Sequence, residues 1–97
     1  MKTTKELNPG EVIFNIDDYR VTRYKYLCVH PTGEGKYHIL INMCEEPFRI
    51  YEKNLQRILD MNLNTYEEAA LELAARLEIK AKMLRFEYQS MLTPKNN

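Results

Sequence analysis

The chain has 97 residues, of which 44% are hydrophobic and 29% are charged, and its formal net charge is zero. This length fits one domain, residues 1–97, with a single modest core. The balanced charge excludes an overall attraction to nucleic acid or to an anionic membrane. No apolar run approaches a membrane span, and the first residues lack an apolar signal core, so we expect a cytoplasmic protein that does not enter membranes.

Alternating apolar residues predict four strands in the first half of the chain. Residues 1–8 are polar and are predicted to form a flexible tail, and "NPGE" at 8–11 has turn chemistry. The period of two that follows is typical of half-buried strands. It recurs in the segments 11–16, 19–30, 37–44 and 48–52. The segment 30–36, "HPTGEGK", has the composition of a hairpin loop.

The segment 53–63 is ambiguous between helix and strand. Leu55, Ile58, Leu59 and Leu63 recur at helical spacing, which favours a short helix. A final strand is the alternative. The expected fold class is α+β: a small antiparallel, SH3-like barrel or sheet over about residues 10–60, followed by a long helix.

The long C-terminal helix is the clearest element, predicted over about residues 66–92. Thr65 followed by Glu68 matches a capping box. Pro94 ends the helix, and residues 93–97 are predicted to form a flexible tail. Glutamates gather early in the helix and basic residues late, in agreement with the helix dipole.

The length of this helix raises the question of what covers it. At 1.5 Å per residue it spans about 40 Å, whereas a compact body made from residues 10–60 is about 20–25 Å across. Roughly a third of the helix would then have no partner in its own chain, although its apolar residues continue on two flanks. We predict a homodimer with antiparallel helices. The candidate interface residues are Leu77, Ala81, Leu84, Phe86, Tyr88 and Met91.

The predicted dimer can be tested by substitution. Leu84→Glu and Phe86→Glu should each give a soluble monomer. The alternative is a helix that breaks or bends, with the segment 53–63 covering the second flank.

Candidate catalytic and metal-binding residues are few. Ser90, the one serine, lies inside the predicted helix near its end, where no catalytic triad can be proposed. No glycine-rich phosphate loop is present. Cys28, His30, His38 and Cys44 could approach a zinc ion across one hairpin, but their spacing matches no zinc module. We therefore predict a non-catalytic protein without a cofactor or a metal.

Tyrosine and basic residues are concentrated in the strand region. The candidate partner surface comprises Arg20, Arg23, Tyr24, Lys25, Tyr26 and Lys36. Such residues can pair across an exposed sheet, anchor a protein interface or stack on bases and neutralise phosphates. We rank these interpretations in that order, with RNA or single-stranded DNA binding as the alternative function.

The order of the segments also carries a resemblance. Pro9-Gly10 enters the first strand, and Thr65, Glu67, Glu68 and Ala69 open the helix. The chain resembles small uncharacterised proteins of bacteria and their phages that have an SH3-like barrel followed by a helix. It departs from them in "QRILDMNL" and in its longer helix. The resemblance implies this fold and a non-enzymatic, regulatory role, such as that of an early phage protein that binds and redirects a host factor.

Overall fold

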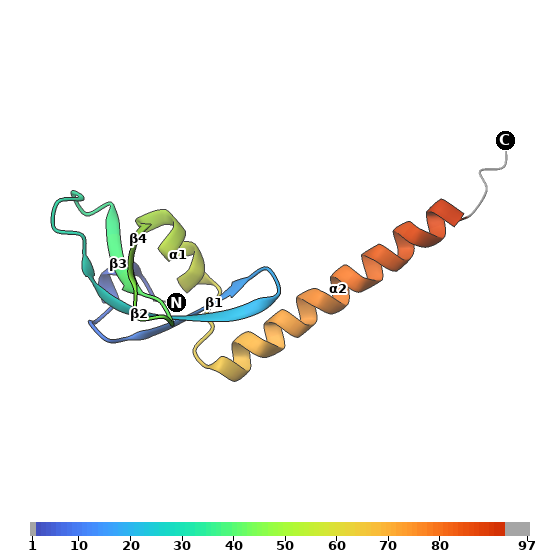
Figure 1. Cartoon of the computed structure of the whole chain (residues 1–97), viewed down its shortest axis with the longest axis horizontal. Coiled ribbons are helices and arrows are strands. Elements are labelled where there is room, and N and C mark those ends of the chain that lie inside the picture. The colour runs from blue at the N-terminus through green and yellow to red at the C-terminus, as the bar shows by residue number, and fades with distance from the viewer. Residues whose placement is uncertain (1, 93–97) are drawn as a thin grey trace.

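A computed structural model describes residues 2–92 of the chain as a small sheet with one short and one long helix (Figure 1). The elements in chain order are a 3-10 turn at Thr4–Glu6, the strands β1 (Val12–Asp17), β2 (Arg20–Val29), β3 (Tyr37–Ile41) and β4 (Pro47–Tyr51), and the helices α1 (Glu52–Asp60) and α2 (Tyr66–Leu92). The molecule is elongated, with extents of 63 × 28 × 27 Å. This confirms the α+β class.

The four strands form an antiparallel meander in the order β1-β2-β3-β4. Asp17 pairs with Arg20 at the end of the first hairpin, and Asp18 has a φ of 52° there, a left-handed conformation that aspartate tolerates better than most residues. Strand β3 ends earlier than predicted because Asn42 Oδ1 accepts the backbone amides of Cys44 and Glu46, both at 2.9 Å. This side-chain cap turns the chain into β4.

The core lies on the inner face of the sheet, beneath α1. Alternation along β2 buries Thr22 and Tyr26, while Leu40 on β3 and Leu55 on α1 are 0% exposed. Ile58 and Leu59 of α1 pack against the same cluster. The helical spacing in 53–63 thus predicted the correct alternative, because it places all of these apolar residues on one side of a helix.

The sheet does not close into a barrel, contrary to the SH3-like expectation. Each strand pairs only with its neighbours in sequence, and β1 and β4 form the two edges. The final strand that could have closed the sheet would have come from 53–63, and this segment is helical. Helix α1 covers part of the inner face instead of extending the sheet.

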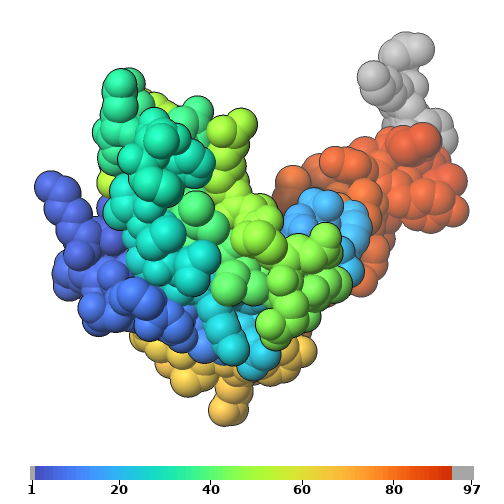
Figure 2. Space-filling model, turned by 60° about the vertical axis from the view of Figure 1, so that its left-hand side comes forward, coloured from blue at the N-terminus to red at the C-terminus, as the bar shows by residue number. Residues whose placement is uncertain are grey.

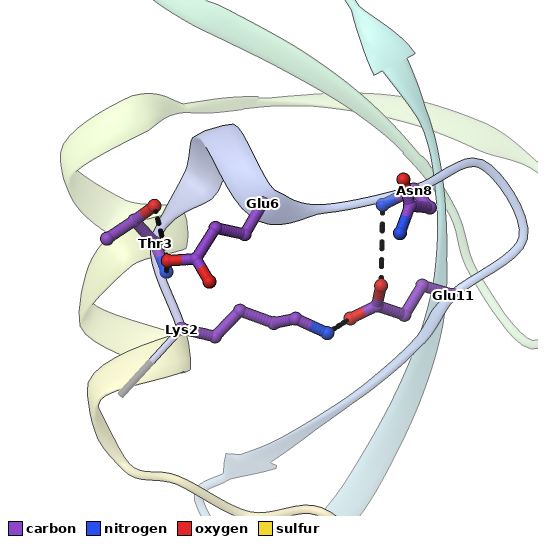
Figure 3. Close-up of polar contacts among 5 residues, drawn as sticks. All are labelled: Lys2, Thr3, Glu6, Asn8 and Glu11. Carbon is purple, nitrogen blue, oxygen red and sulfur yellow. Dashed lines mark hydrogen bonds and ion pairs between the residues drawn. The ribbon is translucent and has the colours of Figure 1, made fainter.

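The N-terminal segment packs against the fold, so the expected flexible tail is wrong for Thr4 and Leu7, which are buried. Thr4 Oγ1 donates to Glu52 Oε1 at 2.9 Å, which ties the segment to the start of α1. Figure 3 shows a further tie, an ion pair between Lys2 and Glu11, and a contact within the segment, in which the Thr3 amide donates to Glu6 Oε1 at 3.1 Å. The predicted C-terminal tail, 93–97, lies outside the described residues.

Helix α2 begins as predicted. Thr65 Oγ1 accepts the Glu68 amide at 3.1 Å, and the Glu68 carboxylate reaches back to the Asn64 amide at 2.9 Å. The helix then runs 27 residues to Leu92 without a break, about 40 Å at 1.5 Å per residue. Its first half packs on the β1–β2 hairpin, and its second half extends away from the sheet (Figure 1).

Candidate interaction surfaces

The second half of α2 is the most exposed apolar part of the described structure. We call residues 81–92 the distal segment. Six of its large side chains are more than half exposed: Met83 at 59%, Leu84 at 55%, Phe86 at 71%, Tyr88 at 62%, Met91 at 83% and Leu92 at 62%. Monomeric proteins rarely leave so many apolar side chains together in water. The distal segment is therefore a candidate contact surface.

The exposed side chains of α2 occupy two opposite flanks. Leu77, Ala81, Leu84, Tyr88 and Met91 follow one another at alternating steps of four and three residues, and we call them the leucine flank. Phe86 comes two residues after Leu84, a rotation of about 200° in an α-helix. It lies on the other side, with Leu71, Ile79 and Met83, and we call these four the Phe86 flank. A single partner helix cannot cover both flanks, so the predicted interface set combines two surfaces.

The boundary between the two halves of α2 is set by the tip of the β1–β2 hairpin. Ala69 is 0% exposed against the sheet, and the ring of Tyr66 meets that of Phe14 edge-on, with centroids 6.5 Å apart. Further along α2, Lys80 contacts the hairpin tip: its Nζ lies 4.5 Å from the centre of the Tyr19 ring and bonds its hydroxyl. Figure 2 shows the hairpin tip in light blue against the orange helix. Beyond Lys80 the helix leaves the sheet.

The structure separates the six residues of the predicted Tyr/Arg surface. Tyr26 is 4% exposed and its hydroxyl is 2.8 Å from His38 Nδ1, so it cannot stack on a ligand. Burial raises the pKa of this hydroxyl. Arg23 and Lys25 point to the outer face of the sheet, opposite Tyr24, because neighbouring residues of a strand alternate. Lys36 lies in the loop before β3. These residues do not form one nucleic-acid surface.

Two of the six residues do line a common groove on the inner face. Arg20 and Tyr24 border an open hollow of about 370 Å³, which α1 does not cover. The Tyr24 and Phe48 rings meet edge-on there, with centroids 5.1 Å apart, and Asp17 at the rim balances the charge of Arg20. A groove with two half-buried rings and no excess of positive charge suits a protein segment better than a phosphate backbone.

A buried polar chain links the sheet to the N-terminal segment, and periodicity did not predict it. His38 is 3% exposed and contacts Tyr26 through Nδ1, while its Nε2 is 3.5 Å from Glu52 Oε1. Glu52 also accepts from Thr4, and this hydrogen bond is the main cause that lowers the pKa of its carboxyl. The only available signal was a lone histidine at an inward position of β3. Its contacts are those of a structural residue.

The four residues considered for zinc do not come together. A bulge between Tyr26 and Cys28 sets Cys28 opposite Ile39 rather than His38. His30 Nδ1 instead accepts the Thr32 amide at 3.2 Å, and Cys44 is exposed in the turn before β4. Among residues 2–92, no three histidine, cysteine or acidic side chains are grouped so that they could hold a metal ion.

Comparison with known proteins gives no relative from which a function could be transferred. No protein-family model matches the chain, and neither curated proteins nor solved structures gave a significant match. Within the described part of the chain, both helices are too short or too polar to span a lipid bilayer. The surfaces of the described residues are therefore the basis for a proposed function.

Proposed function

We propose that this protein is a non-catalytic interaction protein of regulatory type, which forms a homodimer through α2 and binds a protein partner. The observation that carries this proposal is the exposure of the distal segment, where Leu84, Phe86 and Met91 are 55%, 71% and 83% exposed. A helix that needed only to stabilise its own sheet could end soon after Lys80, which contacts Tyr19 at the hairpin tip. The additional apolar turns require another explanation.

Two flanks allow two contacts. If a second copy covers one flank of α2, the opposite flank stays free for a different protein. The open groove beside Tyr24 and Phe48 offers a further protein-binding surface. Nucleic-acid binding ranks lower, because the net charge is zero and the basic residues of β2 are divided between two faces.

The first test is the mass in solution, by light scattering on a sizing column at low and high salt, with absorbance at 260 and 280 nm recorded on the same peak. We expect a dimer of protein alone at both salt concentrations, because apolar contacts are weakly screened. A monomer at all concentrations would refute the homodimer. Excess absorbance at 260 nm that high salt removes would instead support nucleic-acid binding.

The flanks are tested by one substitution in each. Leu84→Glu places a charge on the leucine flank, and Phe86→Glu places one on the Phe86 flank. Both side chains are exposed, so neither change should unfold the domain. Loss of the dimer in at least one variant, measured by sedimentation equilibrium, is the expected result. A dimer that survives in both variants would place the interface outside α2.

A further inference from the structure

The leucine flank has the spacing of a coiled-coil seam. With Ala74 added at its start, the residues Ala74, Leu77, Ala81, Leu84, Tyr88 and Met91 follow at alternating steps of three and four. A repeat of this kind keeps one stripe facing a partner helix over its whole length. The hairpin leaves most of the stripe accessible, since Ala74 is exposed, Leu77 is 37% exposed and Ala81 is half-buried. The inference below rests on the proposed self-association through α2.

Charged residues border this stripe on both edges. Glu78 and Arg85, seven residues apart, lie along one edge, and Lys80 and Glu87, also seven apart, lie along the other. Among residues 2–92, the ion pairs include none formed by Glu78, Arg85 or Glu87. Edge charges of this kind set the orientation and partner of paired helices.

We propose that two copies of α2 pair antiparallel along the leucine flank, in the register that sets Glu78 against the partner's Arg85. In an antiparallel pair, each edge of one helix faces the same edge of the other. The same register brings Lys80 to the partner's Glu87, so the two-fold axis gives four pairs of opposite charge. It also sets Ala81 against the partner's Leu84, which is a small residue against a large one.

The neighbouring registers fail on charge. A shift of seven residues in one direction sets Arg85 against the partner's Arg85 and Glu87 against the partner's Glu87. The opposite shift sets Glu78 against the partner's Glu78 and Lys80 against the partner's Lys80. A parallel pair also brings like charges together. In that arrangement a residue on the Lys80 edge faces the residue five positions later in the partner, on the opposite edge. That arrangement places Lys80 beside the partner's Arg85.

The proposed register also sets a small residue against a large one in two kinds of layer along the seam. Ala74 meets the partner's Met91, as Ala81 meets the partner's Leu84, while Leu77 meets the partner's Tyr88 in a layer of two large side chains. The overlap runs from Ala74 to Met91, about 27 Å of helix at 1.5 Å per residue. The Phe86 flank remains outside this contact and stays exposed, available to another protein.

Charge reversal tests the register. Because Lys80 also contacts Tyr19, the experiment uses Glu78 and Arg85. Glu78→Arg and Arg85→Glu each replace two attractive contacts by two repulsive ones, and each should raise the dimer dissociation constant about tenfold or more. The double variant restores both pairs and should return within about threefold of wild type. The matched control is Lys82→Glu, an equal charge change on the side of α2 away from the leucine flank. It should leave the dissociation constant within about threefold.

These outcomes separate the register from the proposed function. Sedimentation equilibrium is run on wild type, Leu84→Glu, the three charge variants and the control, with helix content checked by circular dichroism. A wild-type monomer would overturn self-association itself. A different result would overturn only the register. In that case the wild type is a dimer and Leu84→Glu is a monomer, but the dissociation constant of the double charge variant is no lower than those of the single variants.

Orientation is tested separately by spin labels. After Cys28→Ala and Cys44→Ser, one nitroxide is attached at Lys82→Cys or at Ser90→Cys, and the distance between the two copies is measured. The proposed register predicts almost no separation along the axis at 82 and about 22 Å at 90, at 1.5 Å per residue. Label-to-label distances that show no axial separation at either 82 or 90 would overturn the antiparallel arrangement.

Discussion

The two helices of this protein differ in how much of their apolar surface is buried within the chain's own fold. Helix α1 has nine residues and turns one apolar side, with Leu55, Ile58 and Leu59, into the core. Helix α2 has 27 residues, carries apolar side chains on two flanks, and buries Ala69 completely while Met91 stays 83% exposed. The apolar residues of α1 therefore stabilise the fold, whereas those of the distal segment are not covered by it, which is the basis of the proposed contact.

The sharpest test of this contrast compares two leucines. Leu55→Ala removes a side chain that is 0% exposed and should lower the free energy of unfolding by about 2–5 kcal/mol, since a cavity remains. Leu84→Ala makes the same chemical change at a side chain that is 55% exposed. At protein concentrations below the dimer dissociation constant, its effect should stay within about 0.5 kcal/mol.

Urea unfolding followed by circular dichroism measures both variants. At higher concentrations Leu84→Ala should become more destabilising than in dilute solution, because the proposed dimer would add stability to the wild type by mass action. If Leu55→Ala and Leu84→Ala lowered the free energy of unfolding equally in dilute solution, the distal segment would pack against its own domain.

A second comparison lies within α2 itself, between two alanines. Ala69 is 0% exposed where the helix meets the sheet, whereas Ala75 is exposed. Ala69→Leu should lower the free energy of unfolding by about 1–3 kcal/mol, because the added atoms have no space in a packed contact. Ala75→Leu should be nearly neutral, and urea unfolding again distinguishes them. If Ala75→Leu were the more harmful change, the face of α2 that packs on the hairpin would have been assigned incorrectly.

The sequence predicted local structure well and the wider packing less well. The helical start at Thr65 and Glu68 is encoded within four residues, so it could be read directly, and the four strands followed from alternation. The open sheet was not foreseen, because the helical spacing of 53–63 identifies a helix but does not show whether the first and last strands pair with each other. The same limit applies to the site residues: alternation showed that Tyr24 and Tyr26 share a face, but not that α1 covers one of them.

Polar contacts between distant segments were missed for a related reason. Thr4 and Glu52 are 48 positions apart, and periodicity says nothing about such a pair. The N-terminal residues look polar and unconstrained, yet Leu7 belongs to the core. Their burial depends on where α1 begins, which only the assembled fold determines.

The smallest expected effect comes from this contact, and it should depend on pH. The Thr4 hydroxyl donates to Glu52 and lowers the pKa of its carboxyl below the ordinary value of 4.5. A group whose pKa is lower in the folded state stabilises the fold above its unfolded pKa, and this stabilisation is lost as the pH falls through the folded value. Thr4→Val should therefore cost about 0.5–1 kcal/mol at about pH 7, a modest figure because the contact is partly exposed.

The difference between Thr4→Val and wild type should shrink as the pH falls toward about pH 3, because protonation of Glu52 removes the charge from the hydrogen bond. Urea unfolding at the two pH values measures it. Thr22→Val is the matched control, because the Thr22 hydroxyl donates to the backbone carbonyl of Asn15 at 3.3 Å. This acceptor does not titrate, so the effect of Thr22→Val should not change with pH. A loss for Thr4→Val that is as large at about pH 3 as at about pH 7 would assign the role of Thr4 to packing. The N-terminal segment would then be held by Leu7 and the shape of Thr4, and the charge of Glu52 would contribute nothing measurable through its contact with Thr4.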